Sequence, residues 1–195
     1  MIPVPPAKSV LINKLTTVFI DRGYEGATLT HLARATGLSK ASLYHHFPGG
    51  KGEMTTLLVQ HTINHLDQMV FRHLQQDKRP GECLINMING FSDYTQAGQS
   101  GCLLAVLSQH PVAHEAVGNA RQVLIKTQFQ TWQRALSDCF KKAGLRPKKA
   151  ARAADEVLNT LYGALQVARL RQQPEVFTTA TKRLNKRISR DYFKA

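Results

Sequence analysis

The stretch TLTHLARATGLSKASLYHHFPGGK, which starts at Thr28, constrains the fold of this chain more than any other. Thr28 can cap a short helix that runs to Ala35, because a threonine hydroxyl accepts a hydrogen bond from an unpaired amide of the first turn. Gly37 is suited to end that helix, since glycine enters a left-handed backbone conformation without steric cost. Ser39 can cap a second helix that runs to His46. Two short helices joined by a tight, glycine-containing turn predict a helix-turn-helix.

A third helix precedes this pair. From Lys8 to Arg22 the apolar residues recur at helical spacing, and Gly23 closes the segment. We expect Phe19 of this helix to pack under Leu32 and Leu43. The sequence therefore predicts an N-terminal three-helix bundle.

The second helix of the pair has a polar side that suits the major groove of DNA. Its residues there are short, basic, hydroxylated or aromatic. We expect Lys40 and Ser42 near base edges. Tyr44, His45 and Lys51 are expected near phosphates. The full set of predicted DNA-binding residues is Thr28, Ser39, Lys40, Ala41, Ser42, Tyr44, His45, His46 and Lys51.

The charge of the chain points to a polyanionic partner. Its 195 residues contain 26 lysines and arginines against 13 acidic residues, a formal net charge of +13. No apolar run is long enough to cross a membrane, and the first residues lack the apolar core of a signal peptide, so we expect a cytoplasmic protein. Three cysteines, Cys83, Cys102 and Cys139, form no pairwise framework and are interpreted as reduced thiols.

The order and spacing of the capping, turn and aromatic residues resemble the N-terminal signature of the TetR family of transcriptional regulators. The residues that carry the resemblance are Gly26, Thr28, Leu32-Ala33, Gly37-Leu38-Ser39, Leu43-Tyr44, His46-Phe47 and Lys51. The loop Pro48-Gly49-Gly50 is longer than in the commonest form of the family, a variant that resembles the LmrA/YxaF-like branch. The alternative is an ordinary helical hairpin, which has no need of an exposed Tyr-His pair beside a lysine.

The rest of the chain is predicted to be helical, giving an all-α protein of about nine helices. We expect a DNA-binding domain over residues 1–50 and a larger ligand-binding and dimerisation domain over 51–195, connected by a helix over 51–76. Further helices are expected over 82–94, 102–107, 111–143 and 148–171, with a last helix from Pro174.

A ligand cavity in the second domain is implied by the family resemblance. The segment Gly101-Cys102-Leu103-Leu104 is similar to a Gly-Cys-Leu segment of several regulators in the family, which suggests that Cys102 borders the cavity. Phe129 and Trp132 suit a cavity wall and a packed core equally well. The candidate ligand-binding residues are Phe91, Cys102, Leu103, Leu107, Phe129, Trp132 and Tyr162. Cys102 is either a redox or electrophile sensor or an inert core residue.

The last two helices are candidates for a dimer interface. The apolar residues of the helix over 148–171 cover more than one face, so that one face needs a partner. Two helices from each subunit would form a four-helix bundle, an arrangement that the resemblance also implies. The predicted interface residues are Val157, Leu161, Ala164, Leu165, Ala168, Phe177, Leu184 and Ile188. A monomer that uses both helices internally is the alternative.

These observations together predict a dimeric transcriptional regulator, more specifically a repressor that a small-molecule inducer releases from a pseudo-palindromic operator. The alternatives are a regulator that senses oxidants or electrophiles through Cys102 and a non-specific DNA architectural protein. An enzyme is not expected, because no Ser/His/Asp order, paired carboxylates or nucleotide-binding glycine loop is present. His61 and His65 lie four residues apart, but the sequence shows no complete set of metal ligands around them, so neither a metal nor another cofactor is expected.

Overall fold

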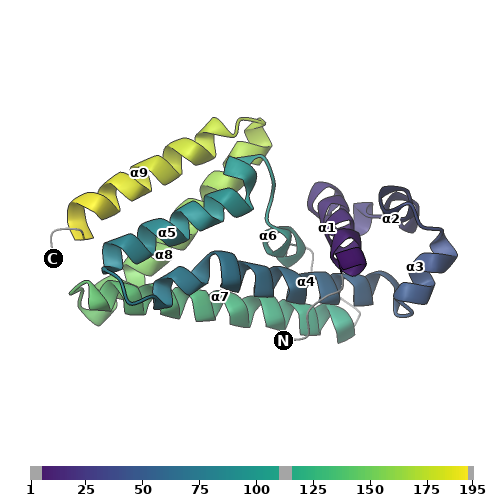
Figure 1. The fold of residues 1–195 in the computed structure, drawn as a ribbon, viewed down its shortest axis with the longest axis horizontal. Coiled ribbons are helices and arrows are strands. Elements are labelled where there is room, and N and C mark those ends of the chain that lie inside the picture. Colours follow the sequence, from purple (N-terminus) through teal and green to yellow (C-terminus); the bar gives the residue numbers. More distant parts are fainter. Residues whose placement is uncertain (1–5, 110–115, 193–195) are drawn as a thin grey trace. The chain divides into compact units, whose positions relative to one another are not determined.

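The structure is a computed structural model that describes residues 6–109 and 116–192. Over these residues the chain forms nine α-helices and two short 3-10 helices, without a strand, as expected for an all-α protein (Figure 1). The elements are α1 (Pro6–Gly26), α2 (Leu29–Thr36), α3 (Lys40–His46), α4 (Gly50–Met69), η1 (Phe71–Gln75), α5 (Pro80–Tyr94), η2 (Gln96–Gly98), α6 (Leu103–Ser108), α7 (Ala116–Lys142), α8 (Pro147–Arg171) and α9 (Glu175–Tyr192).

The α4 helix ends earlier than its sequence pattern predicts. The pattern continues to Gln76, but the α-helix stops at Met69 and Val70 has φ −120° and ψ −67°. Phe71, the first residue of η1, stacks on Trp132 with ring centres 4.3 Å apart and planes 6° from parallel. We attribute the early end to this contact, since packing can override helix propensity.

Two other helix boundaries bear on the predictions. Gly23 interrupts α1 with φ 67° and ψ −178°, a conformation that is not helical, yet helical hydrogen bonding resumes to Gly26. The expected start of the seventh helix at Pro111 lies outside the described residues, and α7 is described from Ala116.

The chain divides into two packing units, and each is made of two separate stretches. The first unit comprises Met1–Thr62 and Cys102–Ile125, and the second comprises Ile63–Gly101 and Lys126–Ala195. The α4 and α7 helices each contribute residues to both units. The expected boundary after residue 50, between a DNA-binding domain and a ligand-binding domain, does not follow from this division and stays a prediction.

The first unit surrounds the helix-turn-helix. Within it α1 packs against α2 and α6, and α2 packs against α3. Phe19, Leu32 and Leu43, the three residues expected in the core of the bundle, are fully buried. The apolar residues of α1, α2 and α3 that were expected to pack together therefore do so inside this unit.

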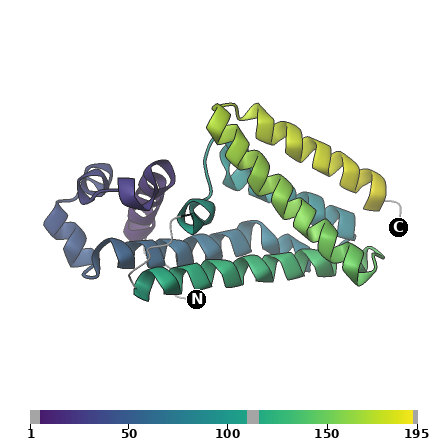
Figure 2. The same ribbon diagram turned by 180° about the vertical axis from the view of Figure 1, so that it is seen from behind.

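The second unit contains α5, α8 and α9. Figure 2 shows α8 and α9 lying side by side, and α5 packs against α9. The η2 turn comes so close to α9 that a Cβ at Gly98 would lie 2.7 Å from the Cβ of Phe177. Gly98 also has φ 92°, so both space and backbone conformation favour glycine there. No helix in the described ranges is long and apolar enough to cross a membrane.

Candidate nucleic-acid interface and ligand site

The helix-turn-helix is held by the three local devices that its sequence predicts. The Thr28 hydroxyl accepts a hydrogen bond from the backbone amide of His31 at 3.3 Å. Gly37 ends α2 in the left-handed conformation, with φ 76°. The Ser39 hydroxyl accepts from the backbone amide of Ser42 at 3.0 Å. The two N-caps and the glycine C-cap are therefore confirmed.

Replacing Ser39 with alanine should lower the free energy of unfolding by about 1 kcal/mol, within a usual range of about 0.5 to 2 kcal/mol. The change removes the acceptor for the amide of Ser42 and the 2.9 Å contact between the two hydroxyls. Urea denaturation followed by circular dichroism would measure it. Ser189→Ala, on the exposed side of α9, is the matched control, and Ser39→Asp should restore the cap. A Ser39→Ala protein as stable as the control would contradict the capping role.

The predicted DNA-facing side of α3 lies at the surface of the molecule. Its apolar counterparts, Leu43 and Phe47, are buried with exposed fractions of 0% and 2%. Tyr44, between them in sequence, is 48% exposed. The exposed residues of α3 are Lys40, Ala41, Tyr44, His45 and His46, and Ser42 is half-buried. The side chains predicted to read DNA are thus accessible, while their contacts with DNA stay predictions.

Lys51 points toward its own chain. Its ammonium donates to the backbone carbonyl of Tyr24 at 2.7 Å and lies 4.3 Å from the centre of the Tyr24 ring. The carboxylate of Glu25 is 4.0 Å away. In this conformation Lys51 connects the start of α4 to the end of α1. To contact a phosphate, as the sequence predicts, the Lys51 ammonium would have to leave the Tyr24 carbonyl and bind DNA instead.

Glu53 makes a contact beside the helix-turn-helix that the sequence reasoning missed. Its carboxylate accepts a hydrogen bond from the backbone amide of Gly49 at 2.7 Å. The contact fastens the loop Pro48-Gly49-Gly50 to the first turn of α4. An acidic residue in the first turn of a helix is a recognised N-terminal signal, and it could have been read from the sequence.

Four of the seven predicted ligand-binding residues form one connected aromatic cluster in the second unit. Ring centres are 5.1 Å apart for Phe129 and Trp132, 4.9 Å for Phe129 and Tyr162, and 5.0 Å for Phe91 and Tyr162. Phe71 extends the cluster through its stack on Trp132. These rings contact one another directly. A ligand that binds among them would have to separate them.

A carboxylate fixes one end of this aromatic cluster. Asp67 accepts from the indole nitrogen of Trp132 at 2.6 Å and from the amide nitrogen of Gln128 at 3.0 and 3.2 Å. Trp132 is 1% exposed, so its N–H needs such a partner. Asp67 was not singled out from the sequence.

The other three predicted ligand-binding residues belong to the first unit. Cys102, Leu103 and Leu107 are buried, with exposed fractions of 1%, 0% and 0%. Cys102 precedes α6, and Leu103 and Leu107 lie on that helix. Their role toward a ligand stays a prediction.

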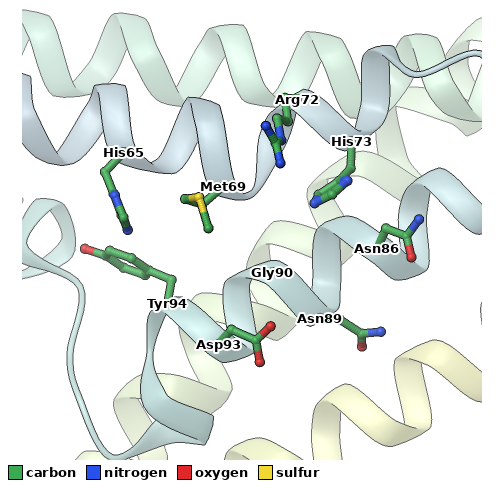
Figure 3. A pocket seen from close by; sticks show the side chains of 9 residues that line it. All are labelled: His65, Met69, Arg72, His73, Asn86, Asn89, Gly90, Asp93 and Tyr94. Carbon is green, nitrogen blue, oxygen red and sulfur yellow. The ribbon is translucent and has the colours of Figure 1, made fainter. Parts of the chain in front are cut away.

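A hollow of about 360 Å³ opens between α4, η1 and α5 in the second unit (Figure 3). His65 lies beside the ring of Tyr94, with ring centres 5.8 Å apart, and the Nδ1 atom of His73 is buried without a hydrogen-bond partner. The lining residues are His65, Met69, Arg72, His73, Asn86, Asn89, Gly90, Asp93 and Tyr94. None of them is in the predicted ligand set. No cluster of three or more potential metal ligands occurs among the residues that the structure describes.

The residues predicted for the dimer interface are mostly internal. Seven of the eight are buried within a single chain; they are Val157, Leu161, Leu165, Ala168, Phe177, Leu184 and Ile188. Only Ala164 is partly exposed. The exposed large apolar side chains of α8 are instead Val167 at 43% and Leu170 at 83%. The seven buried residues therefore pack the core of their own subunit, which corrects their placement at a surface.

Two family profiles match the chain. Residues 11–55 match the bacterial regulatory proteins of the tetR family. Residues 80–183, more than half of the chain, match the C-terminal domain of LmrA/YxaF-like transcriptional regulators.

Individual relatives agree with the profiles. The chain is 41% identical over 44 residues to IcaR of Staphylococcus aureus, a negative transcriptional regulator of the biofilm operon icaADBC. That match covers 23% of this chain, and the chain spans about a quarter of the length of IcaR, 24%.

Solved structures share the fold over nearly the whole chain. A TetR transcriptional regulator from Legionella pneumophila has a TM-score of 0.78 at 13% identity, covering 95% of this chain and 98% of its own. AibR, solved in complex with isovaleryl coenzyme A and operator DNA, has a TM-score of 0.72 at 18% identity with the same coverage. By its two profile matches, one of which covers more than half of the chain, the chain belongs to the tetR family of bacterial regulatory proteins, in the LmrA/YxaF-like branch of transcriptional regulators.

Proposed function

We propose that this regulator is a cytoplasmic repressor that binds a pseudo-palindromic operator as a homodimer and leaves it when a small molecule binds. The observation that carries the proposal is the exposed side of α3, where Lys40, Tyr44 and His45 stand on a short helix with a serine N-cap. IcaR, which is 41% identical to this chain over 44 residues, is a negative regulator, and this supports repression over activation.

Dimer formation is part of the proposal because a single α3 covers only half of such a site. Two recognition helices of a dimer must lie about 34 to 36 Å apart, or a multiple of this, to reach successive major grooves on one side of the duplex. The exposed Val167 and Leu170 on α8 are the apolar side chains that we assign to the subunit contact. Ala164 is the one member of the earlier interface set that is accessible enough to join them.

The small molecule is proposed to act on the second unit. AibR binds isovaleryl coenzyme A, so the fold accommodates an acyl ligand in at least one relative. The aromatic cluster of Phe91, Phe129, Trp132 and Tyr162 offers apolar surface once its rings separate. A ligand shifts DNA occupancy only by its different affinity for the bound and released conformations.

The thiol-sensing alternative has weaker support. Cys102 is 1% exposed, whereas cysteines that react with oxidants or electrophiles are accessible. This burial supports a packing role for Cys102.

Lys40→Ala tests the reading of DNA. A lysine at a base edge discriminates between base pairs. The change should therefore weaken the free energy of binding to the operator by about 1 to 3 kcal/mol, and weaken binding much less on operators altered at the contacted base pair. Fluorescence anisotropy with an operator selected from random-sequence DNA by the wild-type protein measures this. Lys182→Ala removes the same charge from the exposed side of α9 and is the control.

Two outcomes would contradict the proposal. If Lys40→Ala loses the same binding free energy on every operator variant, Lys40 does not read a base pair. Displacement of the wild-type protein from its selected site by random-sequence DNA at nearly equal concentration would favour a non-specific architectural protein instead.

A further inference from the structure

Arg121, near the start of α7, is a charged side chain inside the first unit. It is 1% exposed, among the most buried large side chains of the chain. Removing a guanidinium from water costs several kcal/mol unless its new contacts compensate. The contacts that compensate this cost show which parts of the unit Arg121 holds together.

The contacts of Arg121 reach two other helices of the same unit. Its Nη1 donates to the hydroxyl of Thr55 on α4 at 2.8 Å. Its guanidinium carbon lies 4.8 Å from the centre of the Tyr24 ring on α1, a cation–π distance. Thr55 is 0% exposed and Tyr24 is 5% exposed, so both contacts are shielded from water.

Tyr24 is also the anchor of Lys51. The Lys51 ammonium bonds the Tyr24 carbonyl and lies 4.3 Å from the same ring. Two cations, one from α4 and one from α7, therefore hold the last turn of α1. The chain then passes from α1 through the cap at Thr28 into α2 and α3. The direction of the end of α1 consequently sets where the helix-turn-helix is presented.

We infer that Arg121 is a positioning residue for operator binding: it ties the start of α7 to the end of α1 and to α4, and thereby fixes the orientation of α3. The same helix carries Phe129 and Trp132 of the aromatic cluster farther along. Because α7 is one continuous helix, a ligand that moves it also moves Arg121. This regulatory part of the inference rests on the proposed function; the positioning part rests on the contacts alone.

The test compares specific and non-specific DNA binding. Arg121→Met keeps much of the volume and removes the charge and the hydrogen bond, and Arg121→Lys keeps the charge. We expect Arg121→Met to weaken binding to the selected operator at least tenfold and binding to a random-sequence duplex by less than about threefold, because non-specific binding depends on total charge and not on the spacing of two α3 helices. The operator affinity of Arg121→Lys should lie between those of Arg121→Met and the wild type.

A control separates positioning from simple loss of stability. Ile88 is fully buried on α5 in the second unit and is not among the residues that line the hollow. The control is Ile88→Val or Ile88→Ala, whichever has a Tm closer to that of Arg121→Met. The operator affinities of the control and of Arg121→Met are measured at a temperature where circular dichroism shows both proteins folded. An operator affinity of Arg121→Met equal to that of the Ile88 control would overturn the inference.

Amide hydrogen exchange gives a readout that needs no DNA. In Arg121→Met, exchange should accelerate in peptides that contain Tyr24 and Thr55, and remain as in the Ile88 control in peptides from α8. Unchanged exchange at Tyr24 would overturn the positioning role. A wild-type protein that selects no sequence would instead overturn the proposed function, and the exchange experiment would still decide the role of Arg121.

Discussion

Replacing Trp132 with alanine is expected to lower the free energy of unfolding by about 3 to 5 kcal/mol. Trp132 is 1% exposed, stacks on Phe71 and contacts Phe129. Its removal leaves a cavity that these rings fill only in part, and it takes away the indole donor of Asp67. Small domains are stable by only about 5 to 15 kcal/mol, so this loss is a large fraction of the total.

Urea denaturation at several temperatures would measure the loss, and Trp132→Phe is the comparison. Phenylalanine keeps an aromatic face for Phe71 but has no N–H for Asp67, so a loss of about 1 to 3 kcal/mol is expected from the hydrogen bond. An alanine variant within about 1 kcal/mol of the wild type would show that the aromatic cluster is not a packed core. It would also favour a preformed cavity there.

Alkylation of Cys139 by iodoacetamide at pH 8 should be about a thousandfold slower in the folded protein than in urea-unfolded protein. Burial raises the pKa of the Cys139 thiol from 9.0 to about 12; the nearby Cys83 also raises it, and Lys142 lowers it. The thiolate is the reactive form, and each unit of pKa reduces it about tenfold at pH 8. The thiol is also 2% exposed, which slows the reaction further.

The Cys139 thiol also makes stability depend on pH. Its stabilising contribution is fully present below pH 9.0 and is lost as the pH rises toward 12, because the thiol ionises first in the unfolded chain. Mass spectrometry of the peptide that contains Cys139 follows its labelling separately from that of Cys83 and Cys102 in the unaltered protein. Labelling at the unfolded rate, or stability independent of pH between 9 and 11, would contradict the burial.

The local chemistry of the helix-turn-helix could be predicted because its determinants lie within a few residues of one another. Thr28, Gly37 and Ser39 each act on the turn of backbone next to them, and all three act as expected. The partner of Lys51 could not be predicted in this way. The Tyr24 carbonyl is 27 residues away, and only the packing of α1 against the start of α4 brings it near.

Two other features could not be predicted from the sequence, for related reasons. Apolar periodicity finds the stripes of α8 but does not say which stripe faces inward. The buried Leu161 and Leu165 were therefore assigned to the dimer interface, and the exposed Leu170 was left out of it. A lone arginine such as Arg121 in a helix reads as a solvated residue. Its burial depends on a ring from α1 and a hydroxyl from α4, which no pattern within α7 encodes.

The interleaving of the two packing units has a consequence for how the protein is made. Translation delivers the helix-turn-helix first, but the unit that contains it is completed only by residues 102–125. Arg121 follows its partner Thr55 by 66 residues. A nascent chain that has released only α1 to α4 therefore lacks part of its own interior, and a fragment cut after residue 50 would lack it permanently. The unit that contains α3 is therefore finished late on the ribosome, after all of α5 and α6 have emerged.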